Sequence, residues 1–484
     1  MRTYTIILYL LAFLPKATCA TYEGSNWPQF RGPGGHGVAV EGKTPTQFGP
    51  TTNLLWKAAL PSGHSSPCIW GDRIFLTGFE NEKLETLCLN RRDGKVLWRA
   101  AAPAEKIEPV HRIGSPASPT PSTDGERVFV YFGSFGLISY DFTGRELWRK
   151  ALPSPMIEFG TGSSPLLAGE MLVLNCDQDV DSFITAVDRR TGQTVWRTER
   201  PEFRRGFSSP YLWRHDGVEE IVVEGTVWLK SYDLKDGKER WKMRGLARVT
   251  NASPTSGDGL LFASSWNVGS DVRDHLSLPS WITVTAEHDK NKNGRLSKAE
   301  FPSGPLLDRF SQIDLDKDGS VTPEEWSVSE EIFARAENAL FAVRPGGRGD
   351  ITETHLAWKE TRGLPYVPSA LFYDGRVYVV KNGGMVSCYE AKTGRALYQE
   401  ERLGAVGDYY SSPVAADGKV YFASQQGVVT VLKSGDAFHV LARNELQEPI
   451  MATPAIVDGA VYFRTAGYLF AFGQTPKSEA LHDR

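Results

Sequence analysis

Short segments with alternating apolar and polar positions recur along most of the chain. Segments such as 127–131, 376–380 and 419–422 are brief and rich in Val, Tyr and Phe. This pattern is typical of β-strands, and it is interrupted by turns at regular intervals. Most of the chain is therefore predicted to be all-β.

A Gly turn followed four residues later by an aromatic side chain is repeated along these strands. The clear copies are Gly94 to Trp98, Gly144 to Trp148, Gly192 to Trp196, Gly237 to Trp241 and Gly394 to Tyr398. Gly435 to His439 is a weaker copy, and Trp56 and Trp358 occupy the same place without the Gly turn, which makes eight. We expect the turn to join the third and fourth strands of each unit, with the aromatic side chain on the outer strand against the neighbouring unit.

A small residue followed by Pro marks the other half of the repeat. It occurs at 66–67, 120–121, 164–165, 209–210, 253–254, 412–413 and 453–454, and in inverted order at 368–369. Successive aromatics of the first pattern are 40 to 50 residues apart, except for one gap of 117. A period near 45 with about four strands indicates a β-propeller blade. The sequence predicts eight four-stranded blades, with the first strand, near Trp56, joining the last three in one sheet and so closing the ring.

The long gap contains an insertion with two complete matches to the pattern D-x-[DN]-x-[DN]-G-x5-E. It lies between strands expected at 260–264 and 339–344, the second and third strands of one blade. Both matches resemble EF-hand calcium loops, in which five side-chain or backbone oxygen positions surround the ion and Gly permits the sharp bend. The predicted ligands are Asp289, Asn291, Asn293, Arg295 and Glu300 in the first loop and Asp314, Asp316, Asp318, Ser320 and Glu325 in the second. Arg295 and Ser320, at position seven of each loop, would contribute their backbone carbonyls. Two calcium ions are therefore expected.

The two loops differ strongly in charge. Residues 289–300 carry a net charge of +2, whereas residues 314–325 carry −4. We expect the second loop to bind calcium more tightly. Leu296 and Val321, each at position eight, suit a short strand pairing between the loops, and the apolar face of a following helix, near 324–338, is expected to pack on the propeller.

The loops that precede the inner strands are expected to surround one mouth of the propeller, on the face that carries the insertion. The polar and aromatic residues there are His64, His111, Arg112, Arg204, Arg205, Asn251, Tyr366, Asp408 and Tyr410. Such groups suit a pocket for a small molecule or a docking site for a protein, and they are equally typical of ordinary exposed or capping loop residues.

Composition and charge exclude some classes of function. The chain has 484 residues, 47 of them Gly, and a formal net charge of −4 with no basic block, so nucleic-acid binding is not expected. Residues 1–20 carry a basic residue, a short apolar run and a small-residue end, which predicts a signal peptide and export to the periplasm or the exterior. Lipid anchoring through Cys19 is a less favoured alternative. No apolar run is long enough for a transmembrane segment.

Together these patterns divide the chain into five parts. They are a signal peptide (1–20), a first propeller part (21–267), the EF-hand pair (268–338), a second propeller part (339–473) and a C-terminal tail (474–484). The oligomeric state is left open by the sequence.

The repeats resemble the eight-bladed propellers of the pyrroloquinoline-quinone-like repeat family, including an exported bacterial subgroup that opens with a segment such as Trp27 to Pro33. The resemblance implies three alternative functions: a non-catalytic binding scaffold, a quinone-dependent oxidoreductase, and an assembly factor for outer-membrane proteins. Dehydrogenases of this fold resemble one another in adjacent half-cystines beside the quinone and an Asp base near a channel calcium. The sequence has no Cys-Cys pair, so bound quinone is not expected and the scaffold is favoured.

Overall fold

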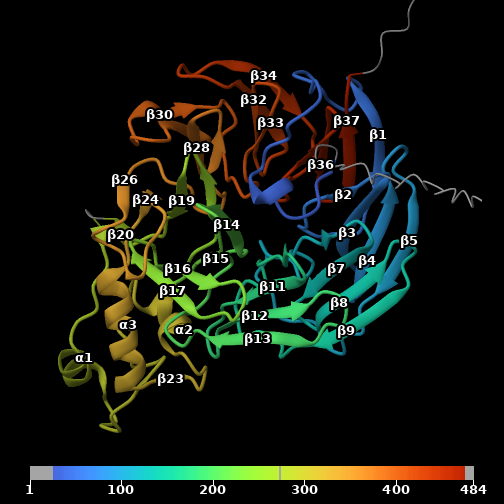
Figure 1. Ribbon diagram of the computed structural model, residues 1–484. Coiled ribbons are helices and arrows are strands. Elements are labelled where there is room, and N and C mark those ends of the chain that lie inside the picture. Colours follow the sequence, from blue (N-terminus) through green and yellow to red (C-terminus); the bar gives the residue numbers. More distant parts are fainter. Residues whose placement is uncertain (1–25, 272–273, 475–484) are drawn as a thin grey trace, which may run out of the picture.

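The computed structural model describes residues 26–271 and 274–474, whose strands form a ring of eight sheets (Figure 1). The predicted signal peptide, Cys19 and residues 475–484 of the predicted tail lie outside the described residues. Each of these sheets is built on four antiparallel strands that follow one another outward from the axis, as predicted for propeller blades, and one sheet gains a fifth strand.

The first four blades follow the chain in order. Blade 1 is β2 (Cys68–Trp70), β3 (Arg73–Glu80), β4 (Lys83–Asn90) and β5 (Val96–Ala101), and blade 2 is β6 (Ser122–Thr123), β7 (Arg127–Phe132), β8 (Gly136–Asp141) and β9 (Glu146–Ala151). Blade 3 is β10 (Leu166–Ala168), β11 (Met171–Cys176), β12 (Phe183–Asp188) and β13 (Thr194–Glu199), and blade 4 is β14 (Tyr211–His215), β15 (Val218–Glu224), β16 (Trp228–Asp233) and β17 (Glu239–Arg244).

The last four blades complete the ring. Blade 5 is β18 (Thr255–Gly257), β19 (Leu260–Ser265), β24 (Ala339–Val343) and β26 (Leu356–Glu360), and blade 6 is β27 (Leu371–Tyr373), β28 (Arg376–Lys381), β29 (Met385–Glu390) and β30 (Ala396–Arg402). Blade 7 is β31 (Val414–Ala416), β32 (Lys419–Ala423), β33 (Val428–Lys433) and β34 (Val440–Glu445), and blade 8 is β35 (Ala455–Val457), β36 (Ala460–Arg464), β37 (Tyr468–Phe472) and β1 (Leu54–Ala59). In blade 8 the first strand of the chain pairs antiparallel with the last, with Lys57 opposite Phe470.

Neighbouring blades are locked together by the repeated aromatic side chains. The Trp196 indole donates a hydrogen bond of 3.0 Å to the Leu234 carbonyl of the next blade, and a Cβ added to Gly237 would lie 2.4 Å from its ring. Trp56, Trp98, Trp148 and Trp358 repeat both features. The Gly turn therefore leaves space for the aromatic ring of the preceding blade, as well as forming a hairpin.

Trp241 departs from this pattern. Its indole donates to Glu220 of its own blade, 3.1 Å away, and its ring packs with buried Ile351. The connection between the third and fourth strands of blade 5 adds β25 (Gly349–Asp350) to blade 4 as a fifth strand, parallel to β17. The added strand β25 lies beside the outer strand of blade 4, at the place where the Trp of the other blades packs against the Gly turn of the next blade.

The segment before β1 lies across the end of the channel that is opposite to the mouth loops. It includes the short helix η1 (Pro33–Gly35), and buried Trp27 pairs through its backbone with Ile69 of blade 1. The Arg31 guanidinium is 1% exposed and donates to the Ala370 carbonyl of blade 6 at 2.5 Å. One N-terminal segment thus contacts blades on both sides of the ring.

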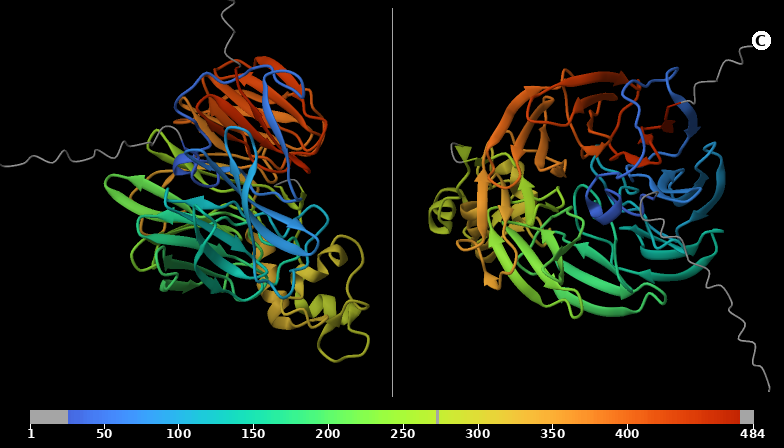
Figure 2. Two further views of the ribbon diagram at one scale, coloured as in Figure 1. Left: turned by 90° about the vertical axis from the view of Figure 1, so that its right-hand side faces the viewer. Right: turned by 45° about the horizontal axis from the view of Figure 1, so that its top comes forward.

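The insertion leaves β19 and returns at β24, and it projects from one side of the ring (Figure 2). Its elements are β20 (Ser270–Asp271), β21 (Asp274–His275), α1 (Trp281–His288), β22 (Leu296–Ser297), η2 (Leu307–Arg309), α2 (Phe310–Ile313), β23 (Ser320–Val321) and α3 (Pro323–Arg335). Leu296 pairs with Val321, which confirms the predicted strand pairing between the loops.

The apolar face of α3 packs mainly inside the insertion. Trp326 is fully buried against Phe301, Phe310 and other residues of the insertion, which form a separate hydrophobic core. The Phe333 ring contacts the propeller, where the Arg248 guanidinium lies 4.4 Å above it. The expectation that this face packs on the propeller holds for Phe333 but not for Trp326, which apolar side chains of the calcium loops and their short helices cover.

Candidate functional site

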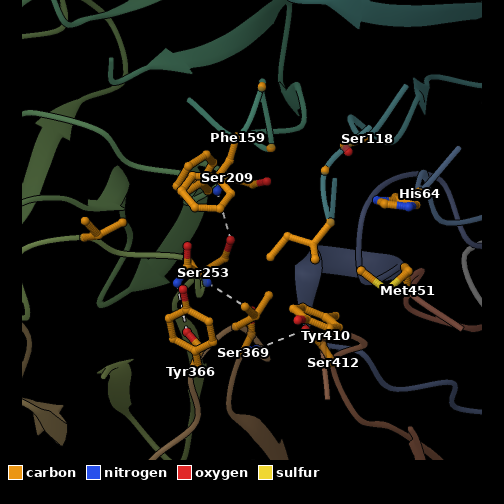
Figure 3. A pocket seen from close by; sticks show the side chains of 18 of the residues that line it. His64, Ser118, Phe159, Ser209, Ser253, Tyr366, Ser369, Tyr410, Ser412 and Met451 are labelled. Carbon is orange, nitrogen blue, oxygen red and sulfur yellow. Dashed lines mark hydrogen bonds between the residues drawn. The ribbon is translucent and has the colours of Figure 1, made fainter. Parts of the chain in front are cut away.

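Eight hydroxyl side chains form a belt around the channel at the small-residue positions of the repeat. The members of this hydroxyl belt are Ser66, Thr120, Ser164, Ser209, Ser253, Ser369, Ser412 and Thr453. Along seven of the steps, the backbone N–H of one member donates to the hydroxyl of the next at 2.9 or 3.0 Å. The belt ties the inner strands together, and Ser209, Ser253, Ser369 and Ser412 are labelled in Figure 3.

Above the belt lies a chamber of about 530 Å³. Phe30 of the N-terminal segment lines it from one side of the belt, while Trp266, Phe159, Phe207, Tyr366 and Tyr410 line it from the loops. Main-chain amides, hydroxyls and the amides of Asn251, Asn267 and Asn382 supply polar groups. The chamber combines aromatic walls with hydrogen-bonding groups, among them the guanidinium of Arg205, which is the composition of a ligand or docking pocket.

The residues of the chamber do not fit the quinone arrangement described for dehydrogenases of this fold. Among the described residues, the lining contains no Asp, Glu or Cys side chain. The four described cysteines, Cys68, Cys88, Cys176 and Cys388, are buried in the blades with free thiols. The chamber therefore lacks both the half-cystine pair and the carboxylate base that such a site uses.

The predicted mouth residues separate into three groups. His64, Arg205, Asn251, Tyr366 and Tyr410 line the chamber, and Figure 3 shows His64, Tyr366 and Tyr410 around it. Arg112 lines a neighbouring cavity together with His64.

His111, Arg204 and Asp408 do not line the chamber. The His111 ring packs on Phe159 at 4.8 Å, so it supports the wall from behind. Arg204 donates to the Phe203 carbonyl at 2.9 Å, and the Asp408 carboxylate accepts from the Tyr410 hydroxyl at 3.4 Å. These three residues position the loops rather than face the channel.

Buried ion pairs organise the mouth where blades 3 and 4 meet. The Arg205 guanidinium chelates Asp179 through Nε and Nη2, at 2.8 and 2.9 Å, and its Nη1 lies 2.7 Å from Glu158. Arg200 chelates Asp177 in the same way, at 2.7 and 2.8 Å. Bidentate pairs of this kind fix the geometry of both side chains.

The insertion is attached to this same group of ion pairs. Lys317, at position four of the second calcium loop, lies 3.1 Å from Asp179 and also donates to the Ser311 and Asp314 carbonyls. Arg248 of the propeller donates to the Gln312 side chain at 2.9 Å, and Gln312 lines the chamber. The segment that precedes the second loop is thus part of the chamber wall.

The second calcium loop has an arrangement that fits a hard divalent cation. Carboxylate oxygens of Asp314, Asp316 and Glu325 lie within 4.8 Å of one another. The Oδ1 atom of Asp314 is buried and has no hydrogen-bond partner among the described residues. Burial, and then the charge of Glu325, raise the pKa of Asp314. A bound calcium would satisfy this oxygen and offset the repulsion between the carboxylates.

The first loop has the same fold with fewer charges. Glu300 accepts hydrogen bonds from the backbone N–H of Asn291 at 3.3 Å and from the Ser297 hydroxyl at 2.7 Å, which parallels the contacts of Glu325. Arg295, at position seven, lies 3.1 Å from the carboxylate of Asp318 in the second loop. A positive side chain of the first loop therefore competes with calcium for a predicted ligand of the second.

A buried carboxyl group lies behind the chamber wall. Glu108 accepts from the Thr161 hydroxyl at 2.8 Å, and Thr161 lines the chamber. Burial raises the pKa of Glu108 to about 7, against the opposing effect of the Thr161 hydrogen bonds. The Oε2 atom has no partner among the described residues. This group changes its protonation state near neutral pH.

Several lining residues were not predicted from the sequence. A Ser or Thr stands at every repeat position of the belt, but this pattern by itself indicates only where the inner strands begin. Phe159, Phe207 and Trp266 lie in loops without a repeated signal, and Gln312 comes from the insertion. No local pattern indicates that these segments meet at one chamber.

No helix in the described part of the chain has the length and apolar character needed to cross a membrane. A relative, the outer membrane protein assembly factor BamB of Alkalilimnicola ehrlichii, is 29% identical over 140 residues, which is 28% of this chain and 33% of the relative. The match therefore spans only about a third of that relative.

Solved structures share the fold at low sequence identity. BamB from Moraxella catarrhalis is 14% identical and covers 88% of this chain and 99% of its own, with a TM-score of 0.53. A europium-containing methanol dehydrogenase is 12% identical and covers 94% and 99%, with a TM-score of 0.58. The quinohemoprotein alcohol dehydrogenase from Comamonas testosteroni is 11% identical and covers 94% and 82%, with a TM-score of 0.57. At these identities the similarities show the fold alone.

Family models match both parts of the molecule. An EF-hand model matches residues 307–328, which include the second loop. A PQQ-like repeat model, described as outer membrane protein assembly factor BamB, matches residues 85–270 and 327–478. Because these segments make up more than half of the chain, the chain belongs to this family of PQQ-like repeat β-propellers, and it carries an inserted EF-hand.

Proposed function

We propose that the chain is an exported, non-catalytic scaffold that binds a protein or small-molecule ligand at its mouth, with calcium in the insertion ordering part of the chamber wall. The observation that carries this proposal is the ion pair between Lys317 of the second loop and Asp179, which Arg205 also chelates. A calcium-loop residue and a chamber-lining residue thus share one buried carboxylate.

Calcium would act on the chamber through a short segment of chain. Asp314, the first predicted ligand of the second loop, follows directly after α2, which contains Ser311 and Gln312. Gln312 lines the chamber, and the Ser311 carbonyl accepts from Lys317. Fixing Asp314 on the ion would therefore restrict both contacts of α2 with the propeller.

Calcium affinity in the range of extracellular modules, about 10⁻⁴ to 10⁻³ M, would suffice outside the cell. At a free concentration of about ten times Kd, binding stabilises the occupied form by about 1.4 kcal/mol. This amount is enough to change local opening of the insertion without changing the fold of the ring.

Hydrogen exchange measured by mass spectrometry with and without calcium tests this proposal. We expect calcium to slow exchange at 307–325 and also at the chamber segment 203–207. Glu325→Gln should abolish both effects, because it removes a predicted bidentate ligand while Gln preserves the capping box of α3. Glu300→Gln is the matched control in the first loop and should leave both effects in place.

A further variant separates binding from coupling. Asp179→Asn removes the charge that Lys317 and Arg205 share. We expect calcium still to slow exchange at 307–325 in this variant, but no longer at 203–207. If wild-type exchange changes only within the insertion, the proposed ordering of the mouth is wrong.

Family membership favours a second candidate, a role in the assembly of outer-membrane proteins. The matching model and the relative from Alkalilimnicola ehrlichii both carry that description. A photo-crosslinking residue in place of Tyr410, in cells of the source organism, should then capture a β-barrel protein or an assembly component. The same residue in place of exposed Leu97, on outer strand β5, is the control. Identical crosslinked products from the two positions would contradict this role.

A further inference from the structure

The chamber above the hydroxyl belt is open at the mouth, and the N-terminal segment lies across its far end. Phe30 of that segment lines the chamber beside the belt, and Val268, which is 58% exposed, lines it from the loops. The volume of about 530 Å³ lies within the range of about 300 to 1,000 Å³ that is typical of small-molecule sites. A ligand therefore enters between the loops and reaches down to the belt.

Aromatic rings surround this space. The ring centres of Phe159 and Phe207 lie 6.2 Å apart in an edge-to-face arrangement, and those of Trp266 and Tyr366 lie 5.8 Å apart in the same arrangement. All four rings are partly exposed, and they come from loops of blades 3, 4, 5 and 6. Figure 3 shows Phe159, Tyr366 and Tyr410 around the same space. Rings held by one another in this way offer apolar faces to a ring-shaped ligand.

Among the described residues, no unpaired charge lines the chamber. The charged side chain of the lining is Arg205, and it is engaged by both Asp179 and Glu158. Burial, and then the charge of Arg464, lowers the pKa of His64 to about 4, so this lining residue is neutral at physiological pH. A charged ligand would lose hydration here without meeting a free counter-charge.

Neutral polar groups of the lining have unused hydrogen-bonding capacity. The Gln312 side-chain oxygen accepts from Arg248 at 2.9 Å, which leaves the NH2 group of Gln312 without a partner in the described chain. The NH2 group of Asn382 is left in the same way, since its oxygen accepts from the backbone N–H of Tyr409. None of the unpaired lining atoms is fully buried, and they include both donors and acceptors. The others without a hydrogen-bond partner in the described chain are Ser66 Oγ, Asn251 Oδ1, Trp266 Nε1, Tyr366 Oη and the His64 ring nitrogens.

We propose that the chamber binds a neutral carbohydrate unit, with its C–H faces against the aromatic rings and its hydroxyls on the unpaired amide and hydroxyl groups. A hydroxyl both donates and accepts, so one sugar ring can satisfy the NH2 groups of Gln312 and Asn382 together with the Asn251 oxygen. An apolar peptide side chain would fill the same space and leave these groups unpaired. This inference rests on the proposed function and deepens it, because it names the class of ligand at the mouth.

Saturation-transfer NMR titration with the methyl glycosides of glucose, galactose, mannose and xylose tests the proposal in calcium-containing buffer. We expect at least one glycoside to bind at least tenfold more tightly than cyclohexanol, which has a similar ring with a single hydroxyl. The same glycoside should also bind at least tenfold more tightly than glucuronate, which adds a charge to the sugar ring. Equal affinities for the glycosides and cyclohexanol, or no binding of any glycoside at about 100 mM, would overturn the proposal.

Variants of the wall locate the binding. Trp266→Ala should weaken binding of the best glycoside at least tenfold, because it removes an aromatic face and a free donor. Trp228→Ala is the matched control and should bind as wild type, since this Trp is also partly exposed but packs under Lys242 outside the lining. If Trp266→Ala does not fold, Tyr366→Phe removes only a hydroxyl without a partner in the described chain, and it should weaken binding at least threefold. Unchanged binding in these two wall variants would overturn the proposal.

Two further comparisons separate the source of the sugar and the role of calcium. A disaccharide that binds more tightly than the methyl glycoside of the same sugar indicates the end of a glycan, and equal affinities indicate a free sugar. Excess chelator should weaken glycoside binding, because Gln312 belongs to α2, directly before the second calcium loop.

The two proposals fail in different ways. Glycoside binding that is the same with and without calcium would contradict the calcium part of the proposed function and leave the sugar site in place. Calcium-dependent hydrogen exchange at 203–207 without glycoside binding would contradict the sugar site alone.

Discussion

Replacing Arg295 by Gln should strengthen calcium binding in the neighbouring second loop. Arg295 belongs to the first loop, and its Nη1 lies 3.1 Å from Oδ2 of Asp318. Both side chains are about half exposed, at 51% and 40%. The substitution leaves the Arg295 carbonyl, the predicted ligand of the first loop, in place.

The magnitude follows from Coulomb's law. Calcium binds carboxylate oxygen at about 2.4 Å, which puts the guanidinium roughly 6 Å from the ion. In a medium close to water, a single charge repels a divalent ion at that distance by about 1.4 kcal/mol. The expected gain is therefore about tenfold in affinity.

Calorimetric calcium titration in a Glu300→Gln background, where the first loop is disabled, measures the second loop alone. The gain from Arg295→Gln should shrink at about 1 M salt, because the Debye length falls to about 3 Å. Lys298→Gln removes the same charge from an exposed position of the same loop that has no recorded contact with the second, and it should change affinity less than twofold. An unchanged or weaker affinity in Arg295→Gln, or an equal gain in Lys298→Gln, would refute the reasoning.

Two further predictions concern the propeller. The pKa of Glu108 is raised to about 7 in the folded protein, against 4.5 for the free side chain. Its contribution to the free energy of unfolding is therefore full below pH 4.5 and is lost as pH rises to about 7, by about 3 kcal/mol in total. Glu108→Gln should lack this slope in denaturant unfolding. A similar slope in the variant would show that another group is responsible. Gly192→Ala, where the new Cβ would lie 2.6 Å from the Trp148 ring, should cost about 2 to 4 kcal/mol, whereas Gly169→Ala, also at positive φ but in open space, should cost about 1 kcal/mol. Equal costs would show that backbone strain, and not the contact with Trp148, dominates.

The propeller could be predicted because its signals are local and repeated. Each Gly turn and aromatic lie four residues apart, and the structure pairs every such Trp except Trp241 with the next blade. The exception depends on β25, a two-residue strand with no distinctive pattern, added from a connection more than a hundred residues later. The sequence of one chain alone gives no indication of such a contact.

The site was predicted less completely, because its parts meet only when the ring is formed. The calcium loops carry their ligands within twelve residues, so their pattern is visible in the sequence. Arg205, Asp179 and Lys317 come from three separate segments, and nothing local indicates that they share one ion-pair network.

The most direct test of the central claim is native mass spectrometry of the mature protein, purified from its own source in calcium-containing buffer. The account predicts a mass that includes two calcium ions, with the first loop losing its ion before the second on dilution into chelator. Glu325→Gln should carry one ion fewer. A protein without calcium, or one that carries the mass of an organic redox cofactor, would contradict a calcium-ordered, non-catalytic scaffold.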